Sequence, residues 1–241
     1  TGGGVVKGLR RLAIVLGLLL VGVAPAAAQR DGGILYAYRQ HAGERAEFDA
    51  GYRSHLEWHR TNQDSLPWYG WDVVSGRRLG EFIDGTFGID FVALDRRVDP
   101  TGDAAHAASS FAGHAEPTAR WMVRLRRDLG TATSLEDRTP APMLLVATYR
   151  VSLAGQTAFE RVLMRLRGTA GLARYAVYES VVGSSDIEYM LMVGRSGFAA
   201  FDDVAADPRR PLNRFLADVD GLDVHAHSEL WQLRQDLTLL P

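Results

Sequence analysis

The segment 74–95 reads VSGRRLGEFIDGTFGIDFVALD, and the segment 181–202 reads VVGSSDIEYMLMVGRSGFAAFD. Aligned without a gap, these segments pair Gly76 with Gly183, Glu81 with Glu188, Phe91 with Phe198 and Asp95 with Asp202. Further matches follow on both sides: Tyr38-Arg39 with Tyr149-Arg150, Phe48 with Phe159, Asp99-Pro100 with Asp207-Pro208 and Gly113 with Gly221. Chance similarity does not keep one order over such a length, so the pattern predicts two homologous units.

The matches place the first unit at residues 33–130 and the second at residues 143–240, with a linker at 131–142. Two prolines in the stretch Thr139-Pro140-Ala141-Pro142 mark the linker, because proline interrupts both helices and strands. The chain is therefore predicted to be a tandem repeat.

Each unit has the pattern strand–helix–strand–strand–helix–strand. In the first unit, alternating and helical spacings of apolar residues predict strands at 34–40, 68–74, 81–87 and 120–128, and helices at 44–62, 91–96 and 103–111. In the second unit they predict strands at 143–152, 173–181, 187–193 and 224–237, and helices at 156–166, 198–205 and 211–218. Within the third strand, Asp84-Gly85 is typical of a turn.

This order is the ferredoxin-like plan, in which helices cover one face of a four-stranded antiparallel sheet. The other face also carries apolar and aromatic residues and must be buried. We therefore expect an α+β protein in which two tandem ferredoxin-like β-α-β-β-α-β units pair their sheets face to face, as an α/β barrel within one chain.

The chain resembles the dimeric α/β-barrel superfamily, which contains antibiotic-biosynthesis-monooxygenase-like and NIPSNAP-like proteins. The resemblance rests on the repeat and on a shared pattern: Tyr-Arg, an amphipathic helix, and Val-x-Gly before the third strand. It extends over nearly all residues after 28. The superfamily includes cofactor-independent monooxygenases, haem-degrading enzymes and chlorite dismutase-like haem proteins, so the resemblance implies a fold and leaves the activity open.

Residues 1–28 have the pattern of a signal peptide. Lys7, Arg10 and Arg11 precede a continuous apolar run from Leu12 to Val23, and small residues end the segment at Ala28. The run is short for a membrane span, which takes about 20 apolar residues. We expect cleavage near Ala28 and a secreted or periplasmic protein outside the membrane; an uncleaved N-terminal anchor is the alternative.

Composition excludes several kinds of chemistry. The chain has 241 residues and no Cys, so it has no disulfide, thiolate nucleophile or Cys-ligated metal. Lys7 is its one lysine, which excludes a Schiff-base lysine after residue 28. Without residues 1–28, 24 Arg stand against 29 acidic residues, a net charge of −5. This balance argues against a nucleic-acid partner.

The most unusual stretch is Pro67-Trp68-Tyr69-Gly70-Trp71-Asp72. In a strand, Trp68 faces one side while Tyr69 and Trp71 face the other, and Tyr178 is the repeat partner of Trp71. These aromatics could bind a planar or apolar ligand between the sheets. Because aromatic character recurs in both units, packing between the sheets is the preferred interpretation.

Two histidine groups are further candidates. His55 and His59 stand four residues apart on the predicted helix face that carries Phe48 and Tyr52, a spacing that can hold a metal. The sequence places no third ligand beside them, so we predict no metal there and partly buried, hydrogen-bonded histidines. His59 is also a candidate ligand contact.

His106 and His114 lie in the Ala- and Gly-rich segment 102–117, whose composition suits a surface loop. The resemblance implies that a histidine in this region could ligate haem iron. The haem-degrading relatives pair it with an Asn on the first strand, which residues 34–38 lack. Haem is therefore the least favoured alternative, and we predict no cofactor.

Two functions remain. The first is binding of a small apolar or aromatic molecule by a monomer or homodimer. The second is a cofactor-independent monooxygenase, for which Tyr36, Tyr38 and His55 are the acid–base candidates. Arg39 and Arg150 recur after the first strand of each unit, and a repeated structural ion pair explains them more simply than an anion site.

Overall fold

The computed structural model describes residues 30–131, 135–169, 174–183, 186–202 and 211–241, so the predicted signal at 1–28 lies outside the described residues. The first half contains β1 (Gly32–Gln40), α1 (Arg45–Thr61), β2 (Tyr69–Ser75), β3 (Phe82–Ile89), α2 (Val92–Asp95), α3 (Pro100–Ser110), η1 (Ala112–His114) and β4 (Ala115–Leu125). The second half contains β5 (Met143–Val151), α4 (Gln156–Arg167), β6 (Tyr175–Val182), β7 (Ile187–Arg195), η2 (Phe198–Phe201), α5 (Pro211–Asp220), β8 (Val224–Leu233) and η3 (Gln235–Leu237).

The eight strands form one closed antiparallel barrel in the order β1-β3-β2-β8-β5-β7-β6-β4. Strands of the first half stand together as β4-β1-β3-β2, and those of the second half as β8-β5-β7-β6. The barrel closes where β2 pairs with β8 and β4 pairs with β6. The predicted α+β class and α/β barrel are confirmed, and closure comes from hydrogen bonds between the edge strands of the two sheets.

Side chains fill the middle of the barrel, and a pocket of about 290 Å³ opens at one end between the two sheets, beside Trp121, Met190 and Glu229. Tyr69 and Trp71 on β2 are fully buried there, together with Tyr178 from β6 and Trp231 from β8. The Trp71 ring stacks on Tyr69 with centroids 5.5 Å apart and tilts against Trp231 at 5.8 Å. This packing agrees with the interpretation of these aromatics as core residues.

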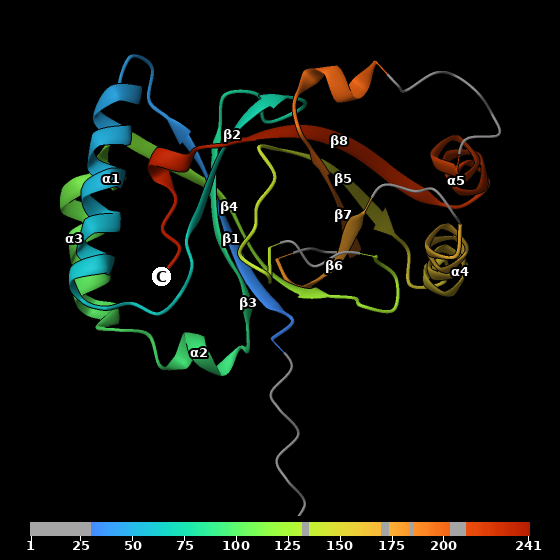
Figure 1. Ribbon diagram of the computed structural model, residues 1–241, viewed down its shortest axis with the longest axis horizontal. Coiled ribbons are helices and arrows are strands. Elements are labelled where there is room, and N and C mark those ends of the chain that lie inside the picture. Colours follow the sequence, from blue (N-terminus) through green and yellow to red (C-terminus); the bar gives the residue numbers. More distant parts are fainter. Residues whose placement is uncertain (1–29, 132–134, 170–173, 184–185, 203–210) are drawn as a thin grey trace, which may run out of the picture.

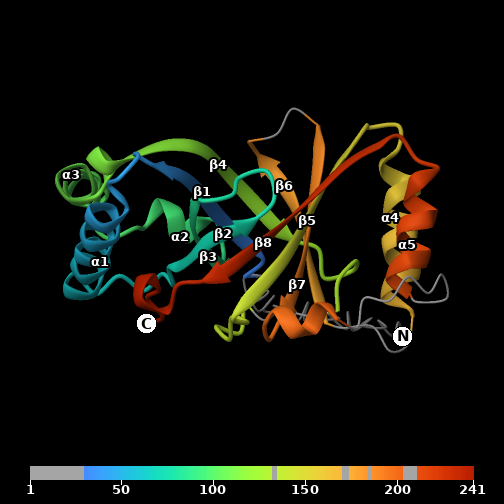
Figure 2. The ribbon, with the colours of Figure 1, turned by 90° about the horizontal axis from the view of Figure 1, so that it is seen from above.

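Helices cover the outside of the barrel in two separate layers (Figure 1, Figure 2). Helices α1 and α3 lie against the first half, and α4 and α5 lie against the second half. The C-terminal residues return to the first half: Leu237 and Leu239 join its outer apolar cluster, and Leu239 forms a bridge with Trp68. No helix among the described residues has the length and apolar character needed to span a membrane.

Two local predictions are wrong. Asp84 and Gly85 lie inside β3, paired with Tyr36 and Leu35 on β1, and do not form a turn. The segment 102–117 forms most of α3, then η1 and the start of β4, so the loop suggested by its composition is wrong and the predicted helix at 103–111 is confirmed. Its alanines favour a helix once the chain packs against α1, because alanine has the highest helix propensity.

Candidate functional site

A pocket of about 120 Å³ lies on the outer face of the first half, between α1, α3 and the strands β1 and β3. Its lining is aromatic and ionisable: Tyr36, Tyr38, Tyr52, His55, His59, Trp68, Asp84, Arg97, Asp103, Ala107 and Phe111. Tyr36 and Tyr38 alternate along β1 and so point to the same side of the sheet. The pocket therefore brings polar groups of two helices against a tyrosine-bearing strand.

Two local features bring α1 and α3 together. A Cβ atom at Gly51 would lie 2.2 Å from the backbone oxygen of Ser110, so glycine in α1 permits close approach of α3. Helix α3 begins at Pro100, and the Asp99 carboxylate accepts a hydrogen bond of 3.0 Å from the Gly102 backbone N–H. This start places Asp103 in the first turn of α3, facing α1.

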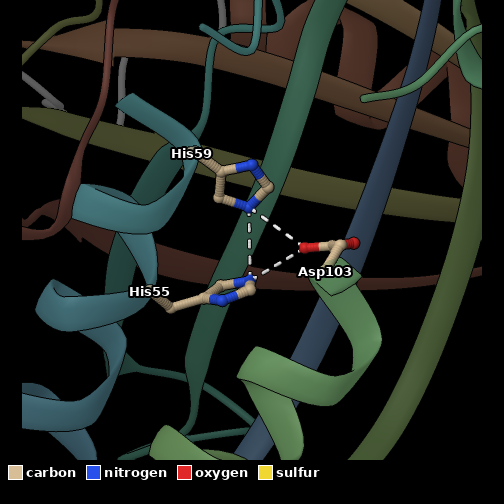
Figure 3. A group of neighbouring side chains, drawn as sticks. All are labelled: His55, His59 and Asp103. Carbon is tan, nitrogen blue, oxygen red and sulfur yellow. Dashed lines mark hydrogen bonds and ion pairs between the residues drawn. The ribbon is translucent and has the colours of Figure 1, made fainter. Parts of the chain in front are cut away.

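His55, His59 and Asp103 form a compact group at this crossing, and Figure 3 shows their ring and carboxylate atoms turned toward one another. His55 Nε2 lies 3.2 Å from His59 Nε2 and 3.2 Å from Asp103 Oδ1, and His59 Nε2 lies 3.4 Å from Asp103 Oδ1. All three are buried, with 7%, 3% and 9% of their surfaces exposed. We call these three residues the His-His-Asp cluster.

Each member of the His-His-Asp cluster has a second polar neighbour. His59 Nδ1 lies 2.8 Å from Asp64 Oδ2, an ion-pair distance without the angle of a directed hydrogen bond. His55 Nδ1 lies 3.2 Å from His106 Nδ1, and Arg97 pairs with Asp103 Oδ2.

Asp64 is itself fixed. The Leu66 backbone N–H donates to its Oδ1 at 3.0 Å, and Trp68 Nε1 donates to its Oδ2 at 3.1 Å. The ring of His59 thus lies between the fixed carboxylate of Asp64 and the other two members of the cluster, His55 and Asp103.

The environment sets the protonation of the cluster. Burial lowers the pKa of His55, although the Asp103 carboxylate opposes this effect. Burial alone would raise the pKa of Asp103, but the neighbouring His55 and the charge of Arg97 outweigh it, and the pKa lies below its ordinary value. At neutral pH the cluster therefore combines a neutral His55 with an ionised Asp103.

Asp84 on β3 is the other ionisable group of the pocket. Burial raises its pKa to about 7, while the hydrogen bond that Tyr52 Oη donates to Oδ2 at 3.0 Å opposes the shift. Its other oxygen, Oδ1, is buried without a hydrogen-bond partner among the described residues. A buried carboxyl that titrates near neutrality and has a free oxygen is suited to exchange a proton with a bound molecule.

The three tyrosines of the pocket also have shifted pKa values. Burial raises the pKa of Tyr36, and it raises the pKa of Tyr38 and Tyr52 still further, with the charge of Asp84 adding to the shift. These hydroxyls therefore stay protonated at neutral pH.

The structure brings together five residues predicted as site residues: Tyr36, Tyr38, His55, His59 and Trp68. Three others lie elsewhere. Tyr69, Trp71 and Tyr178 are in the filled barrel interior and do not line this pocket. Tyr69 Oη donates to the Leu135 carbonyl oxygen at 2.6 Å. These three aromatics therefore lie between the sheets, whereas the outer-face pocket lies outside the barrel wall.

The two haem-ligand candidates separate. His106 lies beside His55, while His114 lies 2.9 Å from Glu44 Oε2 in a half-exposed pair. Sequence reasoning missed Asp84, Asp103, Asp64 and Arg97. The signal that could have found Asp84 is a carboxylate inside an otherwise apolar strand.

No protein-family model matches the chain, and no curated protein is similar to it in sequence. Solved structures are similar in fold. A candidate monooxygenase from Fusobacterium nucleatum has a TM-score of 0.57 and 8% sequence identity, and the match covers 86% of this chain and 94% of that one.

Two further structures are similar. For an anthrone oxidase-like protein, the TM-score is 0.54 with 12% identity over 87% of this chain and 93% of that one. For chlorite dismutase from Candidatus Nitrospira defluvii in complex with imidazole, the TM-score is 0.51 with 6% identity over 87% and 93%. At these identities the likeness shows the fold alone, an α+β barrel.

Proposed function

We propose that the first half binds a molecule about the size of one aromatic ring in the outer-face pocket and removes a proton from it. The observation that carries this proposal is Asp84: it is buried on the pocket wall, its pKa is about 7, and its Oδ1 has no partner among the described residues. A buried carboxyl oxygen without a hydrogen-bond partner lowers the stability of the folded protein, unless a bound molecule supplies that partner.

The size of the pocket sets the size of the ligand. An engineered cavity of about 150 Å³ in another protein binds benzene. A pocket of about 120 Å³ therefore suits a single small ring or a few water molecules. Its tyrosines and Phe111 supply flat apolar walls, and its carboxyls select a ligand that carries a hydroxyl.

The proposed step is a proton transfer from a phenolic hydroxyl to the Asp84 carboxylate. The resulting phenolate oxygen is stabilised by the hydroxyls of Tyr36 and Tyr38, which stay protonated and line the same pocket. Tyr52 orients Asp84 by donating to Oδ2. Neutral His55 completes the polar wall.

Binding measurements test this proposal. We expect phenol to bind more tightly than cyclohexanol, which has similar size but a hydroxyl that does not ionise. Binding of phenol should rise as pH passes about 7, because the ionised Asp84 accepts the hydroxyl proton.

The Asp84→Asn variant should lose this pH dependence, and Asp218→Asn, at a surface pair with Arg165, should keep it. Equal binding of phenol and cyclohexanol at every pH, or an unchanged pH profile in Asp84→Asn, would contradict the proposal.

A cofactor-independent monooxygenase is the second candidate, favoured by the names of two similar structures, the candidate monooxygenase and the anthrone oxidase-like protein. A phenolate is more electron-rich than a phenol and reacts more readily with dioxygen. A monooxygenase would convert phenol and dioxygen into benzoquinone and water, with one oxygen atom of dioxygen in each product. Oxygen uptake with phenol should therefore increase as pH passes about 7 and be lost in Asp84→Asn. Phenol binding without oxygen uptake would contradict the monooxygenase and would be consistent with a protein that only binds its ligand.

Haem does not fit the residues of this site. A macrocycle of four pyrrole rings is several times larger than a pocket of about 120 Å³. The nearest candidate ligand, His106, has its Nδ1 3.2 Å from His55 Nδ1, and His114 is at the surface.

We also propose that residues 1–28 direct export and are cleaved, and that the two halves descend from one ferredoxin-like unit. The basic start, apolar run and terminal alanines support the first point. The second is supported by the recurring element order and by two ion pairs at equivalent places, Arg39–Glu81 at 2.7 Å and Arg150–Glu188 at 3.1 Å. These pairs confirm the predicted structural role of Arg39 and Arg150. A mature N-terminus at Gln29 in exported protein would support cleavage, and an intact terminus would contradict it.

We further propose that the chain works as a monomer. All eight strands find both neighbours within one chain, so a second copy is not needed to close the barrel. Sedimentation at micromolar concentration tests this proposal, and a stable dimer would contradict it.

A further inference from the structure

We propose that the His-His-Asp cluster binds one divalent transition-metal ion of the size of Zn²⁺, with His55 Nε2, His59 Nε2 and Asp103 Oδ1 as its protein ligands. This site goes beyond the acid–base pocket and does not depend on it.

The spacing of the three atoms matches one face of a coordination tetrahedron. With metal–ligand bonds of about 2.0–2.1 Å, two ligands of a tetrahedral zinc ion are separated by about 3.3 Å. The three distances in the cluster are 3.2, 3.2 and 3.4 Å. The atoms thus stand where a metal ion would hold them, and they come from two helices that the Gly51 contact brings together.

Each ligand is also oriented as a metal ligand usually is. Histidines that bind metals commonly direct their second ring nitrogen at a carboxylate or another polar group. Here Asp64 lies beside Nδ1 of His59, His106 lies beside Nδ1 of His55, and Arg97 holds the second oxygen of Asp103. Both Nε2 atoms are thereby turned inward toward Asp103 Oδ1, which is buried without a directed hydrogen bond among the described residues.

The local charge favours a cation. Two carboxylates, those of Asp64 and Asp103, lie beside the imidazoles, and Arg97 is the guanidinium paired with one of them, Asp103, among the described residues. A divalent ion would balance the negative charge that remains after Arg97 has paired with Asp103. The set of two imidazoles and one carboxylate suits zinc, iron(II) or cobalt(II) better than calcium or magnesium, which prefer all-oxygen sites.

All three ligands line the outer-face pocket, together with Tyr36, Tyr38 and Asp84. A ligand bound in the pocket would therefore lie next to the metal. Three protein ligands with one open position are typical of catalytic rather than structural metal sites.

Metal binding tests the inference with no organic ligand present. The full chain, treated with EDTA and dialysed against Zn²⁺, should retain one equivalent of zinc. Co²⁺ in its place should give the strong visible absorption of a tetrahedral ion. His59→Gln and Asp103→Asn should abolish stoichiometric binding, and Asp64→Asn should weaken it about 10–100-fold.

Two variants serve as controls. His114→Gln removes a surface histidine that also neighbours a carboxylate, and it should bind zinc as the unaltered chain does. Asp218→Asn, at a surface pair with Arg165 in the second half, should also bind zinc normally. Zinc binding is measured without phenol, so its failure is distinct from failure of the proposed proton transfer. Circular dichroism shows whether each variant folds, and the Co²⁺ spectrum of the unaltered chain needs no variant. Absence of saturable binding, or zinc retained by both His59→Gln and Asp103→Asn, would overturn the inference.

Discussion

The two helical layers cover the same kind of sheet with different chemistry. In the second half, α4 and α5 bury Phe159, Leu163, Leu166 and Phe215 in one apolar cluster against the strands. In the first half, α1 keeps the equivalent phenylalanine, Phe48, but presents tyrosine and histidines next to it. Both layers contain tyrosines, but the first half adds buried histidines and carboxylates to its layer.

Strand register makes this comparison specific. On β1 and β3, Tyr36 pairs with Asp84; at the corresponding place on β5 and β7, Ala147 pairs with Leu191. Ala147 and Leu191 belong to an apolar cluster, whereas Tyr36 and Asp84 line the pocket. The polar pair Tyr36–Asp84 stands where the second half has an apolar pair, and it makes the folded state less stable than an apolar pair would. Departures of this kind from apolar core packing concentrate at functional sites.

The largest effect is expected from placing the polar group of the first half into the second. Leu191→Asp would bury a carboxylate in an apolar layer that offers it no designed partner. We expect the free energy of unfolding to fall by about 5 kcal/mol at neutral pH, as for an uncompensated buried charge. Urea unfolding measures this loss. Leu191→Asn is the matched control, and the difference between the two should shrink at acid pH. A loss below about 2 kcal/mol would mean that the second half also accommodates a polar site.

The next effect tests what the two layers share. Phe48 and Phe159 are both completely buried, each in the cluster of its own half. Replacing either with alanine should reduce the free energy of unfolding by roughly 3–5 kcal/mol, the usual range for a buried aromatic truncation. Denaturant melts of both variants provide the comparison. A loss below about 1 kcal/mol for Phe48→Ala would show that the first layer has no true core.

A smaller effect distinguishes the two helical layers through the pH dependence of the free energy of unfolding. Because the pKa of Asp84 is about 7 in the folded protein and near 4 when unfolded, the folded state binds the extra proton between these values. The stabilisation is present at acid pH and is lost as pH rises from about 4 to about 7.

Asp84→Asn removes this dependence. It should be as stable as the unaltered chain near pH 4 and more stable by roughly 2–4 kcal/mol at pH 8, measured without metal. Parallel stability–pH curves for the two proteins would mean that Asp84 is not a strained buried acid.

The features that could be predicted from the sequence are those that depend on the local spacing of apolar and aromatic residues. Alternation along the aromatic run places Trp68 opposite Tyr69 and Trp71, and the structure has Trp68 in the outer layer and the other two inside the barrel. Helical spacing places His55 and His59 on the buried face of α1. These inferences hold because side-chain direction follows directly from strand and helix geometry.

The partners of those histidines could not be predicted in the same way. Asp103 reaches His55 only through the packing of α3 on α1, which depends on a backbone contact at Gly51. Asp-Gly favours turns and so predicts a turn at Asp84, but pairing with β1 overrides that local preference. The third ligand and the pocket acid are both products of tertiary contacts, which a single sequence does not reveal.

The smallest effect concerns the ion pair that recurs in both halves. The side chain of Arg39 is 65% exposed and that of Arg150 is 50% exposed. Their partners, Glu81 and Glu188, are buried. Glu81 also accepts a hydrogen bond of 3.0 Å from Thr118 Oγ1, whereas the described partner of Glu188 is Arg150.

Removing the arginine should therefore cost less in the first half. We expect Arg39→Ala to lower the free energy of unfolding by about 0.5 kcal/mol and Arg150→Ala by about 1 kcal/mol, since an exposed pair contributes little but an unpaired buried carboxylate costs more. Thr118→Val in the Arg39→Ala background should remove the difference, because Glu81 then loses its second donor as well. If Arg39→Ala is the more costly change before Thr118 is altered, the two ion pairs are not equivalent supports of the same fold.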